Sequence, residues 1–292
     1  MASAPSEFHE KLKKRKGLLV PGAANALAAL VIADLGYEAV YLSGAGLTNT
    51  FLGMPDLAFI SLPELVQHTM AIKAATGLPL IVDADTGFGN ALNVRHTIQS
   101  LERAGADVIQ LEDQASPKKC GHFSGKEVIP AEEMAWKIRA AVDARRSHET
   151  LIMARTDARA VEGFERAVER AQLYEQSGAD IIFVEAPESI EELERLPQLI
   201  AAPLLINIVV GGKTPIVSQE HLAQMGFALV LYANVALQSA VKGMQTALSL
   251  LKERGQLDED GPVASFRERQ RLVRKPEFDE LEKRYSASSA SA

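Results

Sequence analysis

Acidic side chains stand directly after several short apolar segments of this chain, and their chemistry suits a metal ion. Asp83 and Asp85 end one such segment, Glu112 ends another and Glu185 follows a third. Carboxylates that gather at one place stay ionised together only beside a cation, and oxygen ligands without histidine favour Mg²⁺ or Mn²⁺ over Zn²⁺. Capping of the next helix explains any one of these acids alone, but not the whole set. Asp83 and Asp85, two residues apart in an extended segment, are the first choice as ligands, directly or through water.

The single cysteine lies in a polar loop between two cationic residues. Cys120 follows Lys119 and precedes Gly121 and His122. Most lone cysteines are inert, buried, small hydrophobic residues. Cationic neighbours, however, lower the pKa of a thiol toward the range useful for acid–base catalysis. The context of Cys120 therefore favours a catalytic role, in a loop able to close over a substrate.

Eight short apolar segments recur along the chain, with segments of helical period between them. Their apolar stretches are nearly continuous, which is typical of parallel strands that are buried on both faces. A recurring unit, seen in ERAGADVIQLED and EQSGADIIFVEA, ends a helix at a glycine and then begins a strand. The pattern predicts a (β/α)₈ TIM barrel whose active site lies at the carboxyl ends of the strands. The eight segments are Leu18–Ala23, Ala39–Gly44, Pro79–Asp85, Val108–Asp113, Leu151–Ala158, Ile181–Ala186, Pro203–Val209 and Leu229–Asn234.

Both ends of the chain fall outside the eight units. Residues 1–16 have the pattern of an N-terminal helix, and one long helical pattern runs from Val235 to Glu253. The second helix is left over once the barrel closes, so its apolar face needs a partner subunit. We expect a catalytic domain over residues 1–254, which includes this extra C-terminal helix, and a charged extension over residues 255–292 with a disordered end.

Composition limits the classes of partner. The 292 residues carry a formal net charge of −7 and no long basic block, so a nucleic acid partner is not expected. No segment reaches 18 consecutive apolar residues, and the charged N-terminus lacks the apolar run of a secretory signal. One cysteine cannot form an internal disulfide. These features predict a cytoplasmic enzyme that is not bound to a membrane and acts on a small molecule.

Several motifs resemble those of the isocitrate lyase and phosphoenolpyruvate mutase superfamily. Lys118-Lys119-Cys120-Gly121-His122 is similar to the K-[KR]-C-G-H signature of the branch that contains 2,3-dimethylmalate lyase and 2-methylisocitrate lyase. This resemblance implies a (β/α)₈ barrel that forms homotetramers by swapping its last helix. The other matching stretches are Tyr41–Gly44, Gly53–Asp56, Val82–Asn90, Leu111–Gln114, Ala154–Ala158 and Gly211–Pro215.

The resemblance also implies a role for individual residues. The small substrate would be a 2-hydroxy di- or tricarboxylate whose C2–C3 bond breaks in a retro-aldol sense, giving pyruvate or a related 2-oxo acid and a carboxylate. Mg²⁺ or Mn²⁺ would be held by Asp83, Asp85 and Glu112, with Asp56 acting through water. Cys120 would be the general acid, and the catalytic set would be completed by Lys119, His122, Arg155 and Glu112. Substrate would be bound by Tyr41, Ser43, Gly44, Ala45, Asp56, Gly121, Arg155, Glu185 and Asn207.

The chain departs from the family pattern at two strands. Val209 and Val210 follow Asn207 where relatives carry a threonine or an acid, and Asn234 stands within a changed eighth strand. Both changes lie where the part of the substrate away from the metal is expected to bind, so they bear on substrate specificity more than on the metal chemistry. Three other functions stay open: hydrolysis of oxaloacetate, a carboxyphosphoenolpyruvate mutase reaction, and non-catalytic binding of small acids by the same barrel.

Overall fold

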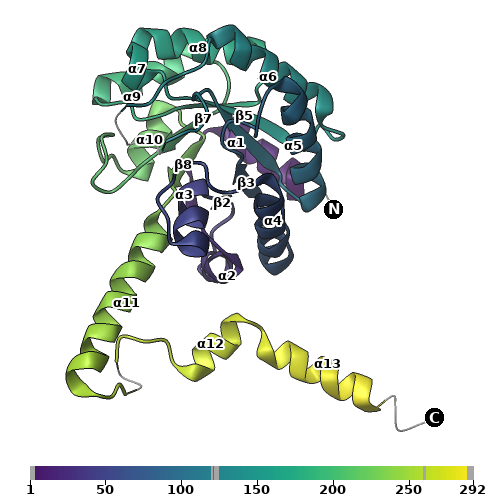
Figure 1. Ribbon diagram of the computed structural model, residues 1–292, viewed down its shortest axis with the longest axis vertical. Helices are drawn as coiled ribbons and strands as arrows, with labels where there is room; N and C mark the ends of the chain where they lie inside the picture. The colour runs from purple at the N-terminus through teal and green to yellow at the C-terminus, as the bar shows by residue number, and fades with distance from the viewer. Residues whose placement is uncertain (1–3, 120, 122–124, 259–260, 288–292) are drawn as a thin grey trace.

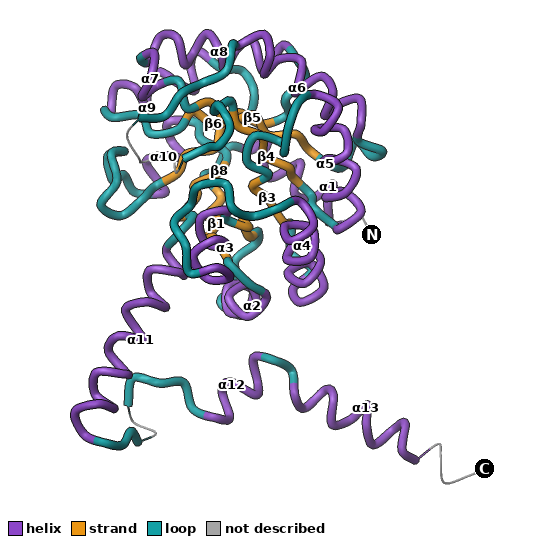
Figure 2. The backbone as a smooth tube through the Cα atoms, viewed as in Figure 1, coloured by secondary structure: helices purple, strands orange, loops and turns teal. Residues whose placement is uncertain are grey.

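Eight parallel strands close into one barrel, as the sequence pattern predicts (Figure 2). Each strand pairs with its neighbour in the sequence, and β8 returns to pair with β1. The computed structural model describes residues 4–119, 121, 125–258 and 261–287. The strands are β1 (Leu18–Ala23), β2 (Val40–Leu42), β3 (Leu80–Asp83), β4 (Val108–Glu112), β5 (Leu151–Thr156), β6 (Ile181–Val184), β7 (Leu204–Asn207) and β8 (Leu229–Tyr232).

Helices cover the outside of the barrel (Figure 1). Those that precede or surround it are α1 (Ala4–Lys14), α2 (Ala26–Asp34), α3 (Gly44–Leu47), the π-helical turn η1 (Thr48–Leu52), α4 (Leu62–Thr76), α5 (Ala91–Ala104), α6 (Ala131–Ala144), α7 (Arg159–Glu162), α8 (Phe164–Gln176), α9 (Ile190–Leu199) and α10 (Gln219–Met225). The glycine stops of the recurring unit are confirmed at Gly105 and Gly178, and Gly36 and Gly226 follow helices in the same way; φ lies between 80° and 110° at all four. Glycine adopts this left-handed conformation without the steric cost that a Cβ atom brings.

The core has two layers, which alternate along each strand. Leu80 and Val82 of β3 face the helices, whereas Ile81 between them faces the barrel interior. Met153 and Phe183 also point into the interior, from β5 and β6. Because side chains of a strand alternate between its two faces, the inward set continues to the mouth of the barrel and selects the residues found there.

Three C-terminal helices leave the barrel and form an arm, here defined as residues 235–287: α11 (Val235–Arg254), α12 (Phe266–Leu272) and α13 (Lys275–Ala287). Figure 1 shows α11 pointing away from the barrel, with α12 and α13 folding back beneath α2 and α4. Arg271 of α12 binds the carboxylate of Asp34 on α2 through two hydrogen bonds of 2.8 and 2.7 Å. The charged sequence of this extension had not been expected to form helices.

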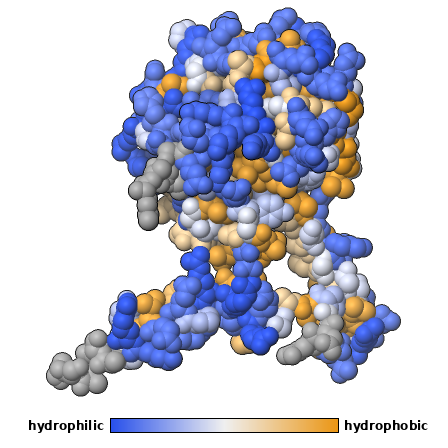
Figure 3. Space-filling view, turned by 180° about the vertical axis from the view of Figure 1, so that it is seen from behind, coloured by the Kyte–Doolittle hydropathy of each residue, from blue (hydrophilic) through white to orange (hydrophobic). Residues whose placement is uncertain are grey.

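Apolar side chains remain exposed where the arm joins the barrel (Figure 3). Leu27 on α2 and Leu35 directly after it are 49% and 69% exposed, and on α11 Met244 and Leu248 are 55% and 61% exposed. The long C-terminal helix is thus confirmed, and it does not cover its own barrel. Within the part of the chain that the structure describes, no helix is both long and apolar enough to cross a membrane.

Candidate active site

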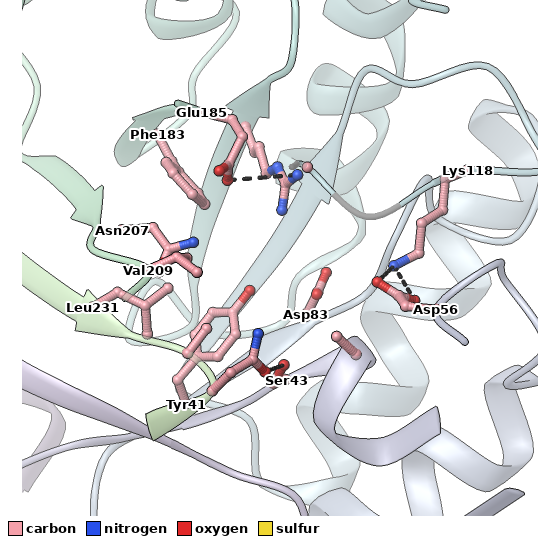
Figure 4. Close-up of a pocket in the computed structure, with 15 residues that line it drawn as sticks. Tyr41, Ser43, Asp56, Asp83, Lys118, Phe183, Glu185, Asn207, Val209 and Leu231 are labelled. Carbon is pink, nitrogen blue, oxygen red and sulfur yellow. Dashed lines mark hydrogen bonds and ion pairs between the residues drawn. The ribbon is translucent and has the colours of Figure 1, made fainter. Parts of the chain in front are cut away.

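The two-layer alternation places the predicted polar residues at one mouth of the barrel. Asp83 lies two residues beyond the inward-facing Ile81, and Arg155 lies two beyond Met153. Glu185 and Asn207 follow the inward-facing Phe183 and Leu205 in the same way, just at or past the strand ends. Figure 4 shows labelled side chains from several strands turned toward one cavity. Of the predicted residues, the cavity is lined by Tyr41, Ser43, Ala45, Asp56, Asp83, Gly121, Arg155, Glu185 and Asn207.

Asp83 is oriented by a buried network that begins at Tyr41. The Tyr41 hydroxyl donates to Gln110 Oε1 at 3.0 Å, and Gln110 Nε2 donates to Asp83 Oδ1 at 3.0 Å. The backbone N–H groups of Gly44 and Asp85 also donate to Asp83, at 3.3 and 3.2 Å. These hydrogen bonds fix the direction of the Asp83 side chain.

The surroundings of Asp85 and Glu112 disfavour the ionised form of both carboxyl groups. Burial raises the pKa of Asp85 to about 6, although the Lys118 ammonium acts against this shift. Burial also raises the pKa of Glu112 well above its usual range, against the charges of Arg155 and Lys118. Asp85 also has a φ of 48°, a conformation that costs a non-glycine residue free energy and that is concentrated at functional sites.

Lys118 supplies the nearest positive charge to this cluster. Its Nζ atom lies 2.7 and 2.9 Å from the two carboxylate oxygens of Asp56, and 2.8 Å from Asp85 Oδ1. The side chain is only 4% exposed. Burial alone would lower the pKa of Lys118, but the surrounding carboxylates outweigh that effect and raise the pKa well above its usual range. The Lys118 ammonium is therefore permanently charged.

The donor set fits a hard divalent cation that keeps much of its water. Neither carboxylate oxygen of Glu112 has a hydrogen-bond donor among the described residues, although Arg155 Nε lies 3.4 Å from Oε2. A side chain at Gly44 would lie 3.1 Å from Asp83 Oδ2 and 3.2 Å from Asp85 Oδ1, so glycine keeps the space between them open. Over the described ranges, no three acidic, histidine or cysteine side chains converge as direct ligands. Mg²⁺ commonly binds in this way, through one or two carboxylates and several waters.

Ser43 and its neighbours close the side of the mouth formed by β2. Ser43 caps α3, because its Oγ accepts a hydrogen bond from Gly46 N at 3.1 Å. The same hydroxyl donates to Asn234 Oδ1 at 3.3 Å, so Asn234 belongs to the site although it had been noted only as a departure from the family pattern. Gly44 and Ala45 follow within α3.

Arg155 lies among three carboxylates. Its Nε and Nη2 atoms donate to Asp157 at 2.9 and 3.0 Å, and Glu185 Oε2 lies 3.5 Å from Nη2. The guanidinium also stacks over the Phe183 ring, with 5.2 Å from Cζ to the ring centroid. A planar donor that is fixed on two sides is well suited to bind a substrate carboxylate on its free edge.

The signature loop is described only in part. Cys120 and His122 lie outside the described residues, so their predicted roles stay predictions. Lys119 is exposed; its Nζ donates to Gly125 O at 2.6 Å, on a pocket outside the cavity. Gly121 packs against the mouth, where an added Cβ atom would lie 2.5 Å from Arg155 Nη2 and 2.8 Å from a Glu185 carbon atom. The lysine that faces the cavity is thus Lys118, one residue before the predicted one.

The opposite side of the cavity contains several apolar residues. Phe183, Val209, Leu231 and Ala233 line it, and Figure 4 shows Val209 and Leu231 on the wall that faces Asp83. Val210, which had been grouped with Val209, is 59% exposed and does not line the cavity. The mouth therefore combines charged side chains at β2–β5 with a mixed surface at β6–β8, where these apolar residues lie beside Glu185, Asn207 and Asn234.

Sequence reasoning missed three residues that this geometry identifies. Lys118 opens the recognised signature, so the motif itself could have indicated it. Phe183 could have been found from strand alternation, since it lies two residues before Glu185. Asn234 follows β8 and was visible only as an unusual residue. No pattern in the sequence marks these as neighbours of the same cavity.

Comparisons with known proteins agree with this geometry. The family model of phosphoenolpyruvate phosphomutase matches residues 8–252. A 2-methylisocitrate lyase of Aeropyrum pernix is 49% identical over 85% of this chain and 80% of its own length. A 2,3-dimethylmalate lyase of Eubacterium barkeri is 44% identical over 85% of this chain and 86% of its own length.

Solved structures agree over nearly the whole chain. A 2,3-dimethylmalate lyase superposes with a TM-score of 0.91 at 30% identity, covering 98% of this chain and 96% of the other. An oxaloacetate acetylhydrolase with 3,3-difluorooxalacetate also scores 0.91, at 29% identity, covering 97% of both chains. A phosphonopyruvate hydrolase complexed with oxalate and Mg²⁺ scores 0.87 at 28% identity, covering 97% of this chain and 99% of that one. Together with the barrel and its acidic mouth, these matches show that the chain belongs to the phosphoenolpyruvate phosphomutase family within the isocitrate lyase superfamily.

Proposed function

We propose that this protein is a Mg²⁺-dependent carbon–carbon lyase that acts on a substituted 2-hydroxy di- or tricarboxylate of the 2,3-dimethylmalate or 2-methylisocitrate type. The products are pyruvate or a related 2-oxo acid and a carboxylate. One observation carries the proposal: Asp83 and Arg155 line the same cavity, Asp85 Oδ1 lies beside Asp83 at Gly44, and the buried Glu112 lies 3.4 Å from Arg155. The names of two relatives, a 2-methylisocitrate lyase and a 2,3-dimethylmalate lyase, agree with this reaction class.

The acidic cluster is the proposed metal site. Asp85, Asp83 and Glu112 would hold Mg²⁺ directly or through water, and Asp56 would take part through water. Bound there, Mg²⁺ would lower the pKa of the substrate hydroxyl and neutralise the adjacent carboxylate. The raised pKa values of Asp85 and Glu112 support this assignment, because both groups lack sufficient positive charge around them.

The remaining residues bind substrate and move protons. Arg155 binds a substrate carboxylate through the edge of its guanidinium that Asp157 leaves free. Ser43, Gly44 and Ala45 bind the carboxylate of the 2-oxo acid, while Tyr41, Gly121, Glu185 and Asn207 line the rest of the cavity. Once the 2-hydroxyl has lost its proton to water, its oxygen forms the carbonyl of the 2-oxo acid as the C2–C3 bond breaks. The electron pair of that bond goes to the fragment that contains C3, and Cys120 donates a proton to that fragment at C3. Lys119 and His122 tune the thiol.

The exposed apolar residues on α2 and α11 favour a homo-oligomer. A tetramer in which α11 exchanges between subunits would bury Met244 and Leu248 against the uncovered side of a neighbouring barrel. The catalytic domain would then include residues 1–254, and residues 255–292 would form an extension.

A pyruvate-release assay, coupled to lactate dehydrogenase, tests the reaction. The panel is 2,3-dimethylmalate, 2-ethyl-3-methylmalate and 2-methylisocitrate, each with Mg²⁺ and with EDTA. Metal-dependent release of pyruvate from 2,3-dimethylmalate or 2-methylisocitrate, or of 2-oxobutyrate from 2-ethyl-3-methylmalate, supports a lyase. No 2-oxo acid from any of the three contradicts the proposed reaction. Oxaloacetate is followed in parallel through oxalate, because an oxaloacetate acetylhydrolase superposes as well as the lyase does. Oxalate formation without pyruvate would favour hydrolysis instead.

A further inference from the structure

A second lysine of the loop between β4 and α6 is buried against the active site. The side chain of Lys126 is 2% exposed, and its ammonium has two partners. Nζ donates to Asp157 Oδ1 at 2.6 Å and to the carbonyl oxygen of Gly121 at 2.6 Å. A lysine is seldom buried to this degree unless its charge is paired, and here both partners belong to the mouth of the barrel.

Asp157 connects Lys126 to the guanidinium of Arg155. The Asp157 carboxylate is completely buried, and its Oδ1 atom accepts hydrogen bonds from both Arg155 Nη2 and Lys126 Nζ. Its Oδ2 atom accepts from Arg155 Nε at 2.9 Å, and its backbone N–H donates to Asp113 Oδ1. One carboxylate thus holds two cations in fixed relative positions, and its own backbone is tied to β4.

Gly121 connects Lys126 to the same guanidinium from the other side. A Cβ atom at Gly121 would lie 2.5 Å from Arg155 Nη2, so the backbone there packs directly on the arginine. Lys126 donates to the carbonyl oxygen of that residue. Lys126 and Arg155 therefore share two neighbours. Both cations contact Asp157 on one side and Gly121 on the other.

We propose that Lys126 is a positioning residue, which sets the Arg155 guanidinium through Asp157 and the loop backbone through Gly121 O. The inference rests on the proposed function, because Arg155 acts there as the substrate-binding arginine. Without the Lys126 ammonium, a buried carbonyl oxygen loses its donor and Asp157 is neutralised by Arg155 alone. The Arg155 guanidinium and the Gly121 backbone are then no longer held in fixed positions relative to each other. A displacement of about 1 Å at such a contact can lower turnover about 100-fold.

A matched control is available on the far side of the barrel. Lys73 also donates to one carboxylate and one carbonyl oxygen, Asp107 Oδ2 at 2.6 Å and Leu78 O at 3.1 Å. Asp107 precedes β4, so this pair lies at the amino end of the strands, away from the mouth. Lys126→Met and Lys73→Met therefore remove the same kinds of contact, one to a carboxylate and one to a carbonyl oxygen, although Lys73 is 29% exposed and Lys126 is 2% exposed.

Two measurements test the proposal. In the pyruvate-release assay, Lys126→Met should lower kcat about 10- to 100-fold, whereas Lys73→Met should stay within about twofold of wild type. In the absence of substrate, iodoacetamide should alkylate Cys120 at least about fivefold faster in Lys126→Met than in wild type or Lys73→Met. Alkylation depends on the exposure of a thiol as well as on its pKa, and release of the Gly121 backbone should raise that exposure. Equal effects of the two substitutions in both measurements would overturn the inference.

A double variant tests the route through Asp157. If Lys126 acts through that carboxylate, the double variant Lys126→Met with Asp157→Asn should lose no more activity than the less active of the two single variants. Losses that multiply would contradict this route. An inactive wild-type protein would contradict the proposed function instead, and the alkylation rates would then decide the role of Lys126 alone.

Discussion

Both carboxylate oxygens of Asp56 contact the ammonium of Lys118, at 2.7 and 2.9 Å, in a site where the lysine is 4% exposed. The same ammonium lies 2.8 Å from Asp85. A monovalent cation therefore stands beside the carboxylates proposed to bind Mg²⁺. The positive charge of Lys118 reduces the repulsion between the carboxylates of Asp56 and Asp85. The same charge also repels a metal ion that binds to these carboxylates.

Lys118→Met should tighten metal binding while lowering turnover. At an effective dielectric of 20, a unit charge and a divalent ion about 4 Å apart repel each other by roughly 8 kcal/mol. Relaxation and water cancel most of this repulsion, and we expect the remaining effect to raise the affinity about 10-fold, which corresponds to about 1.4 kcal/mol. Turnover should fall, because Asp56 loses its only close cation among the described residues. Titration with Mn²⁺, followed by electron paramagnetic resonance, measures the affinity. The exposed Lys119→Met variant is the control and should bind Mn²⁺ like wild type; weaker binding in Lys118→Met would contradict the argument.

The alternation of strands explains why much of the site could be predicted from sequence. Asp83, Arg155 and Glu185 end segments whose apolar runs were recognisable, and parallel strands present their carboxyl ends at one mouth. No such rule orders a loop. Lys118 and Lys119 are adjacent and chemically identical, yet one is buried on Asp56 and the other donates to Gly125 O. Only the path of the backbone decides which of them faces the cavity.

Contacts between residues far apart in the sequence could not be predicted either. Lys126 meets Asp157, a residue 31 positions later, and nothing local to either marks the pair. Likewise, α12 and α13 come from a charged segment without a strong apolar period, and α12 is held by the pairing of Arg271 with Asp34. Partners 237 residues apart cannot be read from a local pattern.

Asp85→Asn should remove the stabilisation that Mg²⁺ confers. At a free concentration of about 100 times Kd, a ligand of the native state adds about 2.7 kcal/mol, or about 5 °C in Tm for a chain of this size. The wild-type protein should show this shift and the variant should not, because an amide carries no charge to bind the ion. Differential scanning calorimetry with Mg²⁺ and with EDTA measures the effect. A full shift in the variant would mean that the ion binds elsewhere.

Cys120→Ser should separate metal binding from catalysis. A serine hydroxyl is a far weaker acid than a thiol, so turnover should fall about 10²- to 10⁴-fold, the usual contribution of a general acid. The Mg²⁺-dependent rise in Tm should remain as in wild type. The pyruvate-release assay and calorimetry on the same preparation measure both properties. Near-normal turnover would exclude Cys120 as the proton donor.

Val209 and Val210 provide an adjacent pair with different surroundings. Val209 is among the apolar residues that line the cavity, whereas Val210 is 59% exposed. Each buried methylene is worth about 0.8 kcal/mol, so Val209→Ala should raise KM for 2,3-dimethylmalate roughly 10-fold. Val210→Ala should change KM by less than about twofold, as surface substitutions usually do. Equal effects of the two substitutions would show that Val209 does not contact the substrate's alkyl groups.

Removal of residues 235–292 should disrupt the quaternary structure. The deleted segment includes α11, whose Met244 and Leu248 are more than half exposed. Leu27 and Leu35 of the remaining barrel are also exposed. If α11 exchanges between subunits, the truncated barrel keeps Leu27 and Leu35 exposed but loses the helix that would cover them, so monomers or aggregates should form. Size-exclusion chromatography with multi-angle light scattering distinguishes these states. A control that ends after Gly255 retains α11 and should keep the oligomeric state of the full chain. A well-behaved tetramer without residues 235–292 would rule out helix exchange, because no other part of the arm would remain to join the subunits.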